Sequence, residues 1–268
     1  MPELPEVQTV LEGFIEAVGS TRITALDCYY PGTVILDPEL ESSVFPAQIQ
    51  GHRRLGKYMT ISLKGGHSLV VHLRMTGKLV YNPSPDEPLK HERARFSLEN
   101  GAVVHFIDIR TFGKIILCKS SNLERYLPNL GAEPLEPCYT AAYLQKQLSS
   151  RKAPIKNALL DQSVVAGLGN IYVCELLYRA KIHPETPSNQ VNLRSLQRIV
   201  KETRQVLAEA IAVGGTSVSD FRSIDDKTGS FQNFLRVYQK TECPRGHKIA
   251  NVKLAGRSSF YCPVCQHP

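Results

Sequence analysis

The sequence predicts an α+β protein with a β-sandwich lobe, an α-helical lobe and a small metal-type β-hairpin, in that order along the chain. Three observations predict this fold class. Apolar residues change from helical spacing to strict alternation near residue 21. They return to helical spacing after the Pro- and Gly-rich segment 127–137. Cysteine and histidine then gather in the last 35 residues.

The chain opens with "MPELPEV", which we interpret first as a helix start. Apolar residues at helical spacing predict an amphipathic helix over 4–18. Pro5 suits its first turn, where a missing N–H costs nothing, and Glu3 and Glu6 favour the positive helix end. The opening therefore has a purely structural explanation, and the rest of the chain decides whether it also has a chemical role.

Residues 21 to 120 alternate in polarity and are interrupted by hairpin-type turns at Gly65-Gly66 and Asn100-Gly101. This pattern favours a β-sandwich that carries the N-terminal helix. The predicted strands are 22–30, 57–63, 68–80, 92–98, 102–109 and 113–119.

The second lobe follows the linker, and segment 214–231 lacks periodicity and is predicted to be a mobile loop. The predicted helices are 140–149, 155–162, 171–180 and 192–212. The expected domains are a β-sandwich domain 1–126, a linker 127–139, a helical domain 140–233 that includes the 214–231 loop, and a hairpin 234–268.

Charge and hydropathy indicate the kind of partner and the cell compartment. The formal net charge is +7 with a sequence pI near 9.0, and residues 234–268 hold six basic residues against one acid, Glu242. Nucleic acid is therefore favoured over a merely solvated basic face. No apolar run approaches the length of a membrane span, and the acidic, polar start is unlike a secretory signal, so we expect a cytoplasmic protein.

The stretch "GLGN" joins two predicted helices. Gly167 and Gly169 permit a tight turn, and Asn170 is a good N-cap for the helix that follows. Free N–H groups at such a helix start bind phosphate well, and Arg151 and Lys156 lie upstream. Without the charge context, an ordinary helical hairpin would be an equally good interpretation.

Two segments, "HLRMTG" and "DIRTFGK", each place a bulky apolar residue near a strand end and a glycine. Taken alone, Met75 and Phe112 would more often be core residues. Arg110 shares the strand face of Phe112, and a cation beside an apolar ring near a turn suits insertion into a base stack.

The C-terminal group is Cys243-x3-His247-x14-Cys262-x2-Cys265. Two pairs of soft or borderline ligands across a short hairpin are typical of one structural Zn²⁺ per chain. The other four cysteines are scattered singly, as small core residues often are.

These features occur together in one family. On "MPELPEV", "GKYM", "HLRMTG", "DIRTFG", "VVAGLGNIY" followed by "KIHP", and "GRSSFYCPVC", the chain resembles the bacterial formamidopyrimidine-DNA glycosylases from end to end. Endonuclease VIII is a relative, but "PELPE" favours the formamidopyrimidine branch. One departure is "CPRGH", which lacks the second cysteine of the family's first pair and leaves His247 as the replacement ligand.

The resemblance implies a monomeric, bifunctional DNA glycosylase and AP lyase of base excision repair. Such enzymes excise 8-oxoguanine and formamidopyrimidines, opposite cytosine in duplex DNA, and cut the strand by β,δ-elimination. It also implies a helix–two-turn–helix with its turn at "GLGN" and a zinc hairpin that carries Arg257 at its tip. In the cell, DNA binding would associate the protein with the nucleoid.

This chemistry explains the opening stretch. Removal of Met1 would leave Pro2 as a secondary amine that attacks C1′ of an extruded nucleotide and forms a cationic iminium. An α-amine has a pKa of about 8, against about 10.4 for the lysine side chain, so a larger fraction of it is unprotonated and nucleophilic at neutral pH. Glu3 can protonate the sugar or relay protons, whereas Glu6 is expected to orient the site or cap the helix.

The remaining roles follow from the resemblance. Lys57 would act in elimination and Arg257 would hold the phosphates of the lesion. The 214–231 loop would close over the flipped base. Phosphate contacts are expected at His91, Arg151, Lys156 and Asn170, and void filling at Met75, Arg110 and Phe112.

Two alternatives stay open. One is an endonuclease VIII-like enzyme for oxidised pyrimidines. The other is a non-catalytic, damage-binding paralogue, against which the intact Pro2, Glu3 and Lys57 argue.

Overall fold

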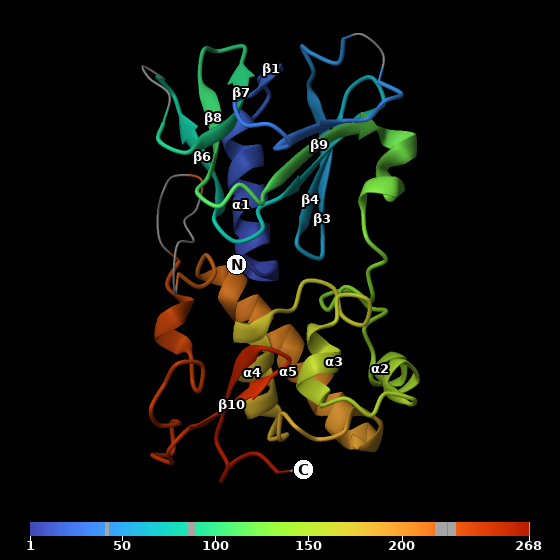
Figure 1. The fold of residues 1–268 in the computed structure, drawn as a ribbon, viewed down its shortest axis with the longest axis vertical. Coiled ribbons are helices and arrows are strands. Elements are labelled where there is room, and N and C mark those ends of the chain that lie inside the picture. The colour runs from blue at the N-terminus through green and yellow to red at the C-terminus, as the bar shows by residue number, and fades with distance from the viewer. Residues whose placement is uncertain (41–42, 85–88, 218–223, 225–228, 268) are drawn as a thin grey trace. The chain divides into compact units, whose positions relative to one another are not determined.

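The computed structural model describes residues 1–40, 43–84, 89–217, 224 and 229–267, and its chain divides into two compact units (Figure 1). The N-terminal unit comprises Met1–Pro128 with Gly214–Ser230, and the C-terminal unit comprises Asn129–Val213 with Phe231–Pro268. Segment 214–231, which the sequence placed in the helical domain, therefore groups mainly with the β-rich unit. Ile224 explains this, because its side chain is buried in the N-terminal core.

Helix α1 spans Leu4–Val18, as its apolar spacing predicted. Glu3 is its N-cap and forms a capping box with Glu6, in which each side chain accepts the backbone N–H of the other residue. The apolar face of α1 is buried in the N-terminal unit, so the helix start is held at a defined place beside the strands.

Within the described residues of the N-terminal unit, the strands form two sheets, which confirms the predicted N-terminal β fold with its helix. The four-stranded sheet has the order β1-β7-β8-β6, and the five-stranded sheet has the order β2-β9-β5-β4-β3. The strands are β1 Ile23–Cys28, β2 Val34–Leu36, β3 Ile49–Leu55, β4 Tyr58–Leu63, β5 His67–His72, β6 Gly77–Asn82, β7 Glu92–Leu98, β8 Val103–Asp108 and β9 Lys114–Lys119.

The single strand predicted over 68–80 is wrong. Its two halves are β5 and β6, which belong to different sheets, and the chain turns between them at 73–76. Gly77 allows this turn: its N–H donates to Leu73 O at 3.1 Å, and a Cβ at Gly77 would lie 2.4 Å from that oxygen. The sequence also missed the edge strands β2 and β3, in which no side chain is fully buried, so the apolar alternation is weak.

Both sheets and α1 contribute to one apolar core. Phe14 of α1 packs edge-on against Phe96 of β7, with ring centroids 5.5 Å apart. The largest buried side chains of this unit include Phe14, Phe96, Phe106 and Met59. A shared core of this kind fixes the strand ends, from which the loops of the candidate site project.

The C-terminal unit contains the predicted helices and the C-terminal hairpin. Glu175 of α4 is fully buried and accepts the backbone N–H groups of Arg236, Val237 and Tyr238, each at 2.9 Å, which anchors the chain leading into the hairpin. The elements are α2 Ala141–Leu148, α3 Ile155–Leu160, α4 Asn170–Ala180, α5 Leu193–Ala212, β10 Ala250–Leu254 and β11 Arg257–Tyr261. The short 3₁₀ helices of the chain are η1 Ser120–Tyr126, η2 Ser188–Gln190 and η3 Phe231–Phe234.

Within the described ranges, every helix is too short or too polar to cross a bilayer.

Candidate active site and metal centre

The N-terminal segment is buried and tightly held. Pro2 is buried, and Glu3 and Glu6 are 4% and 2% exposed. The Glu6 carboxylate accepts Glu3 N–H at 2.8 Å through Oε2 and Thr216 N–H at 2.8 Å through Oε1. One carboxylate therefore fixes both the segment that carries Pro2 and the start of the 214–231 segment, which fits the expected orienting role.

Lys57 lies in the tight turn between β3 and β4, and it is buried. Gly56 adopts a φ of 59°, which suits a residue without a Cβ. Arg54 connects this turn to α1, because it donates to Gly56 O at 2.9 Å and to Gln8 Oε1 at 3.0 Å. The Lys57 ammonium group is thus carried on a turn that Arg54 connects to α1, the helix that follows Pro2.

His72 ends β5 beside this turn. Its ring packs edge-on against Tyr58 at 4.4 Å, and its Nδ1 accepts Arg74 N–H at 2.9 Å. Burial, and then the positive charges of Arg74 and Lys57, lower the pKa of His72 to about 3. His72 is consequently a neutral acceptor that shapes the following loop, not a proton donor at neutral pH.

Met75, Arg110 and Phe112 lie on two loops of the N-terminal unit, and they are not core residues. Met75 is 42% exposed and Phe112 is 49% exposed. The Arg110 guanidinium stacks over the Phe112 ring at 4.9 Å from its centroid. Exposed apolar side chains beside a stacked cation are suited to entering a base stack.

His91 precedes β7 and adopts a φ of 65°, which is unusual for a residue with a side chain. Its Nδ1 lies 3.4 Å from a guanidinium nitrogen of Arg93. His91 as a whole is half-buried.

In the C-terminal unit, the "GLGN" turn precedes α4, but the cap differs from the prediction. Gly169 is the N-cap and Asn170 is the first helical residue, because the Asn170 Nδ2 donates to Ser258 O at 3.0 Å instead of closing the helix end. Gln162 braces the turn by accepting Gly167 N–H at 2.9 Å and donating to Leu168 O at 2.9 Å. The positive end of the α4 dipole lies at this turn.

Lys156 does not occupy the place expected of a DNA contact. It is fully buried on α3, and its Nζ donates to Ser258 O at 3.1 Å and to Ser259 Oγ at 2.5 Å. The structure therefore corrects the prediction that Lys156 contacts DNA, since its side chain instead holds β11 through Ser258 and Ser259. Arg151 is more accessible, but it is paired with Asp161 at 2.8 Å.

The hairpin tip follows the expectation. Ala255 and Gly256 form the two-residue turn between β10 and β11, with φ angles of 45° and 77°. Both values are positive, as in the hairpin turn that matches strand twist. Arg257 follows the turn directly, pairs with Leu254 and is exposed.

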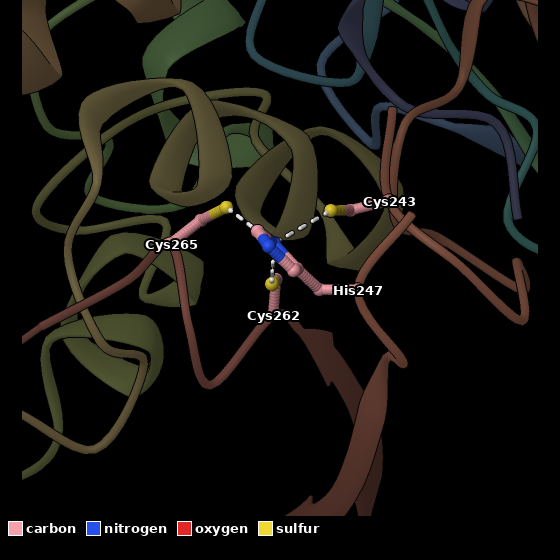
Figure 2. Close-up of side chains that lie close together, drawn as sticks. All are labelled: Cys243, His247, Cys262 and Cys265. Carbon is pink, nitrogen blue, oxygen red and sulfur yellow. Dashed lines mark hydrogen bonds between the residues drawn. The ribbon is translucent and has the colours of Figure 1, made fainter. Parts of the chain in front are cut away.

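The four predicted metal ligands converge on one point (Figure 2), which confirms that they form one cluster. Their ligand atoms all lie within 4.8 Å of one another. His247 Nδ1 lies 3.6, 3.8 and 3.4 Å from the sulfurs of Cys243, Cys262 and Cys265. A tetrahedron with the usual Zn–N and Zn–S bond lengths has an N–S edge of about 3.6 Å. The spacings therefore fit a tetrahedral metal site better than direct hydrogen bonds.

The surroundings of this cluster also suit a metal. Burial works to raise the pKa of the Cys243 thiol, but the backbone N–H groups of Arg245 and His247 outweigh it and lower the pKa to about 6. A thiolate is the form that binds metal. The three cysteines pack with Tyr178 and Val237 in a small apolar cluster, the kind of limited core that a metal can stabilise.

Sequence reasoning missed the polar side chains that support these groups. Asp108 and Glu175 each accept two or more backbone N–H groups, whereas Gln162 accepts one and donates to the carbonyls of Leu160 and Leu168. Asp108 opens the quoted "DIRTFG" motif, which was a usable signal. Glu175 and Gln162 have no local signature, because their partners are set by the fold.

Comparisons with known proteins agree with this geometry. Residues 1–115 match the family model described as the formamidopyrimidine-DNA glycosylase N-terminal domain, and residues 130–222 match that described as the formamidopyrimidine-DNA glycosylase H2TH domain. A formamidopyrimidine-DNA glycosylase of Pelotomaculum thermopropionicum is 43% identical over 274 residues, covering 99% of each chain. One of Rickettsia felis is 38% identical over 272 residues, covering 100% of this chain and 99% of its own.

Solved structures give the same answer. The Lactococcus lactis enzyme in complex with DNA containing N7-benzyl-Fapy-dG has a TM-score of 0.91, 34% identity and full coverage of both chains. The same enzyme with DNA containing an abasic site has a TM-score of 0.90 and 33% identity over 99% of this chain and 100% of its own. The fold and the site thus define a DNA glycosylase. The chain belongs to the formamidopyrimidine-DNA glycosylase family.

Proposed function

We propose that this chain excises oxidised purines, 8-oxoguanine and formamidopyrimidines, from duplex DNA and then cuts the strand at the abasic site. The observation that carries the proposal is the buried Pro2-Glu3 start held by Glu6. Once Met1 is removed, this start would present the Pro2 amine next to the Glu3 carboxylate at the start of α1. Family membership supports both the glycosylase and the AP lyase activity.

The amine of Pro2, once Met1 is removed, attacks C1′ of the extruded nucleotide. The bond from C1′ to the base nitrogen breaks, and its electron pair leaves with the base, which takes up a proton. Glu3 donates a proton to the sugar ring oxygen, and the opened sugar becomes an iminium on Pro2. Loss of a C2′ proton then expels the 3′ phosphate, and Lys57 stabilises the developing charge on this group.

Extrusion leaves a gap in the duplex, and three side chains fill it. Met75 and Phe112 supply apolar surface, and the Arg110 guanidinium donates to the acceptor edge of the orphaned cytosine. This selects lesions opposite cytosine. The exposure of the three side chains supports the proposal, because their burial in free protein would cost energy to reverse.

Phosphate contacts come from His91, Arg151, Asn170 and Arg257, each on a turn, a helix start or a hairpin tip. In this proposal catalysis belongs to 1–126, further DNA contacts to 140–233 and the metal hairpin to 234–268, although segment 214–230 groups with the N-terminal unit. The partner is damaged duplex DNA, bound by a single copy of the chain. Sedimentation of the protein with one lesion duplex tests the monomeric state.

Borohydride trapping tests the nucleophile. Incubation with an abasic duplex and borohydride should join Pro2 covalently to DNA, and peptide mapping should find the adduct at the N-terminus. Pro2→Gly or a retained Met1 should weaken trapping, whereas Pro5→Ala, three residues along, should leave it intact. An adduct on an internal lysine would refute the assignment, and excision of oxidised pyrimidines in preference to purines would favour an endonuclease VIII-like enzyme.

We also propose that Cys243, His247, Cys262 and Cys265 hold one structural Zn²⁺, which keeps Arg257 in place. The N–S spacings near the edge of a zinc tetrahedron support it. Bound there, zinc supplies a rigid staple and takes no part in bond breaking. Elemental analysis should find one zinc per chain, lost in His247→Ala and kept in the matched Cys28→Ser. Metal-free protein that still cleaves damaged DNA would contradict the site.

A further inference from the structure

Asp108, the last residue of β8, joins two loops of the N-terminal unit. Its side chain is buried, and its Oδ1 accepts the Thr76 hydroxyl and Arg110 N–H, the latter at 3.2 Å. Its Oδ2 accepts Gly113 N–H at 2.7 Å. Arg110 N–H also lies 3.0 Å from Thr76 Oγ1. One carboxylate therefore ties the loop that holds Met75 to the loop that holds Arg110.

The backbone of Asp108 binds a third loop. Its N–H donates to His91 O at 3.0 Å, and its carbonyl accepts Arg93 Nε at 2.7 Å. Arg93 in turn reaches the His91 ring. The three loops that carry proposed DNA contacts thus meet at one residue, and that residue is itself inaccessible to DNA.

Each of these loops contains a residue in a backbone conformation that residues with side chains seldom adopt. The φ angles are 56° at Arg74, 65° at His91 and 60° at Thr111. Such conformations are costly and persist only where neighbouring interactions over-determine them. Hydrogen bonds to an ionised carboxylate are stronger than those between neutral groups, so Asp108 is placed to offset this cost.

We propose that Asp108 is a positioning residue, which sets Met75 and Arg110 in one fixed arrangement so that both enter the base stack together. The inference rests on the proposed function and adds to it a specificity determinant that does not touch DNA. An acid is required, because donors converge on both oxygens. Asparagine would turn an NH₂ group toward an N–H donor.

The test compares substrates that need void filling with one that does not. Asp108→Asn should lower excision of 8-oxoguanine from duplex DNA, and the preference for cytosine opposite it, by roughly tenfold or more, the scale of one lost charge-assisted hydrogen bond. Cleavage of single-stranded abasic DNA should be retained, because no base has to be extruded. Fluorescence of 2-aminopurine beside a duplex abasic analogue should rise less on binding than with wild type.

Milder variants guard against a simple folding defect. Thr76→Val removes only the hydroxyl and should shift the same two readouts in the same direction, and Thr76→Ser should restore them. Asp108→Asn combined with Arg110→Ala should discriminate no worse than Arg110→Ala alone, because both changes act on one interaction.

A matched control is Asp37→Asn in the same unit. Asp37 is 3% exposed and also accepts backbone and amide N–H groups, from Glu39 at 3.1 Å and Asn122 at 2.9 Å, so its loss should affect stability alone. Equal losses on duplex and single-stranded substrates in Asp108→Asn, or unchanged discrimination in Thr76→Val, would overturn the inference. Failure of the wild-type chain to prefer cytosine would instead overturn the proposed void filling.

Discussion

Glu6→Gln tests whether one side chain holds both the proposed amine of Pro2 and the 214–231 segment. Glu6 is 2% exposed and accepts two backbone N–H groups, from Glu3 and Thr216, each at 2.8 Å. Glutamine keeps the size of the side chain and one acceptor oxygen. It replaces the other oxygen with an NH₂ group that faces an N–H donor, so one of the two hydrogen bonds is lost.

The magnitude follows from that one bond. A hydrogen bond to a charged group contributes about 1.5–3 kcal/mol, and loss of the carboxylate charge at a helix start costs about 0.3–1 kcal/mol more. The expected loss is therefore roughly 2–4 kcal/mol in the free energy that holds the segment in place. At about 1.4 kcal/mol per factor of ten, this corresponds to a tenfold or larger fall in single-turnover excision.

Single-turnover excision of 8-oxoguanine from a duplex measures the effect, and thermal unfolding measures stability alongside it. Glu12→Gln is the matched control, because Glu12 lies on the same helix and is exposed. It should leave both measurements unchanged. If Glu6→Gln excises at the wild-type rate, the carboxylate does not position the amine, and the argument from its two hydrogen bonds fails.

Three further predictions concern other parts of the chain. Lys156→Met should lower the unfolding midpoint and speed chelator-induced metal loss, because β11 loses its buried donor; unchanged metal release would refute the supporting role. Arg110→Ala should reduce the preference for cytosine opposite the lesion. Arg151→Ala should weaken binding to every duplex and reduce the slope of log K against log salt concentration by about 0.9. Identical losses in both variants, whatever the opposite base, would contradict void filling. Burial works to raise the pKa of Glu92, but hydrogen bonds from Arg95 and a buried histidine lower it overall. The stability that Glu92 adds is therefore present above the ordinary pKa of 4.5 and lost as pH falls through the lowered one. Unfolding of Glu92→Gln should depend less on acid pH, and an unchanged pH profile would contradict this.

Local signals in the sequence were enough for several features. The spacing of apolar residues located α1, whose bounds are Leu4–Val18. Ligand types and spacing identified the metal cluster, including His247 in place of a cysteine. Both signals are short-range: a helix buries one face at a fixed period, and a tight turn brings ligands four residues apart to one metal.

Other features were decided by tertiary structure. The sequence merged β5 and β6 because both are apolar, and only the turn closed at Gly77 sends them to different sheets. Sequence reasoning placed Lys156 among the DNA contacts. The sequence could not show that Lys156 is buried beneath β11, because its partner Ser258 lies about a hundred positions away. Edge strand β3 gave no clear apolar alternation because none of its side chains is fully buried.

The chain alone thus determined which residues are present: a proline near the start with two carboxylates, a cation after a glycine, and four soft or borderline ligands. Only the fold decided which groups those side chains meet. Glu6 binds Thr216, and Asp108 binds Thr76, across 210 and 32 positions of sequence. Contacts at such separations leave no periodic or spacing signal, because they depend on how sheets and loops pack and not on the order of neighbouring residues.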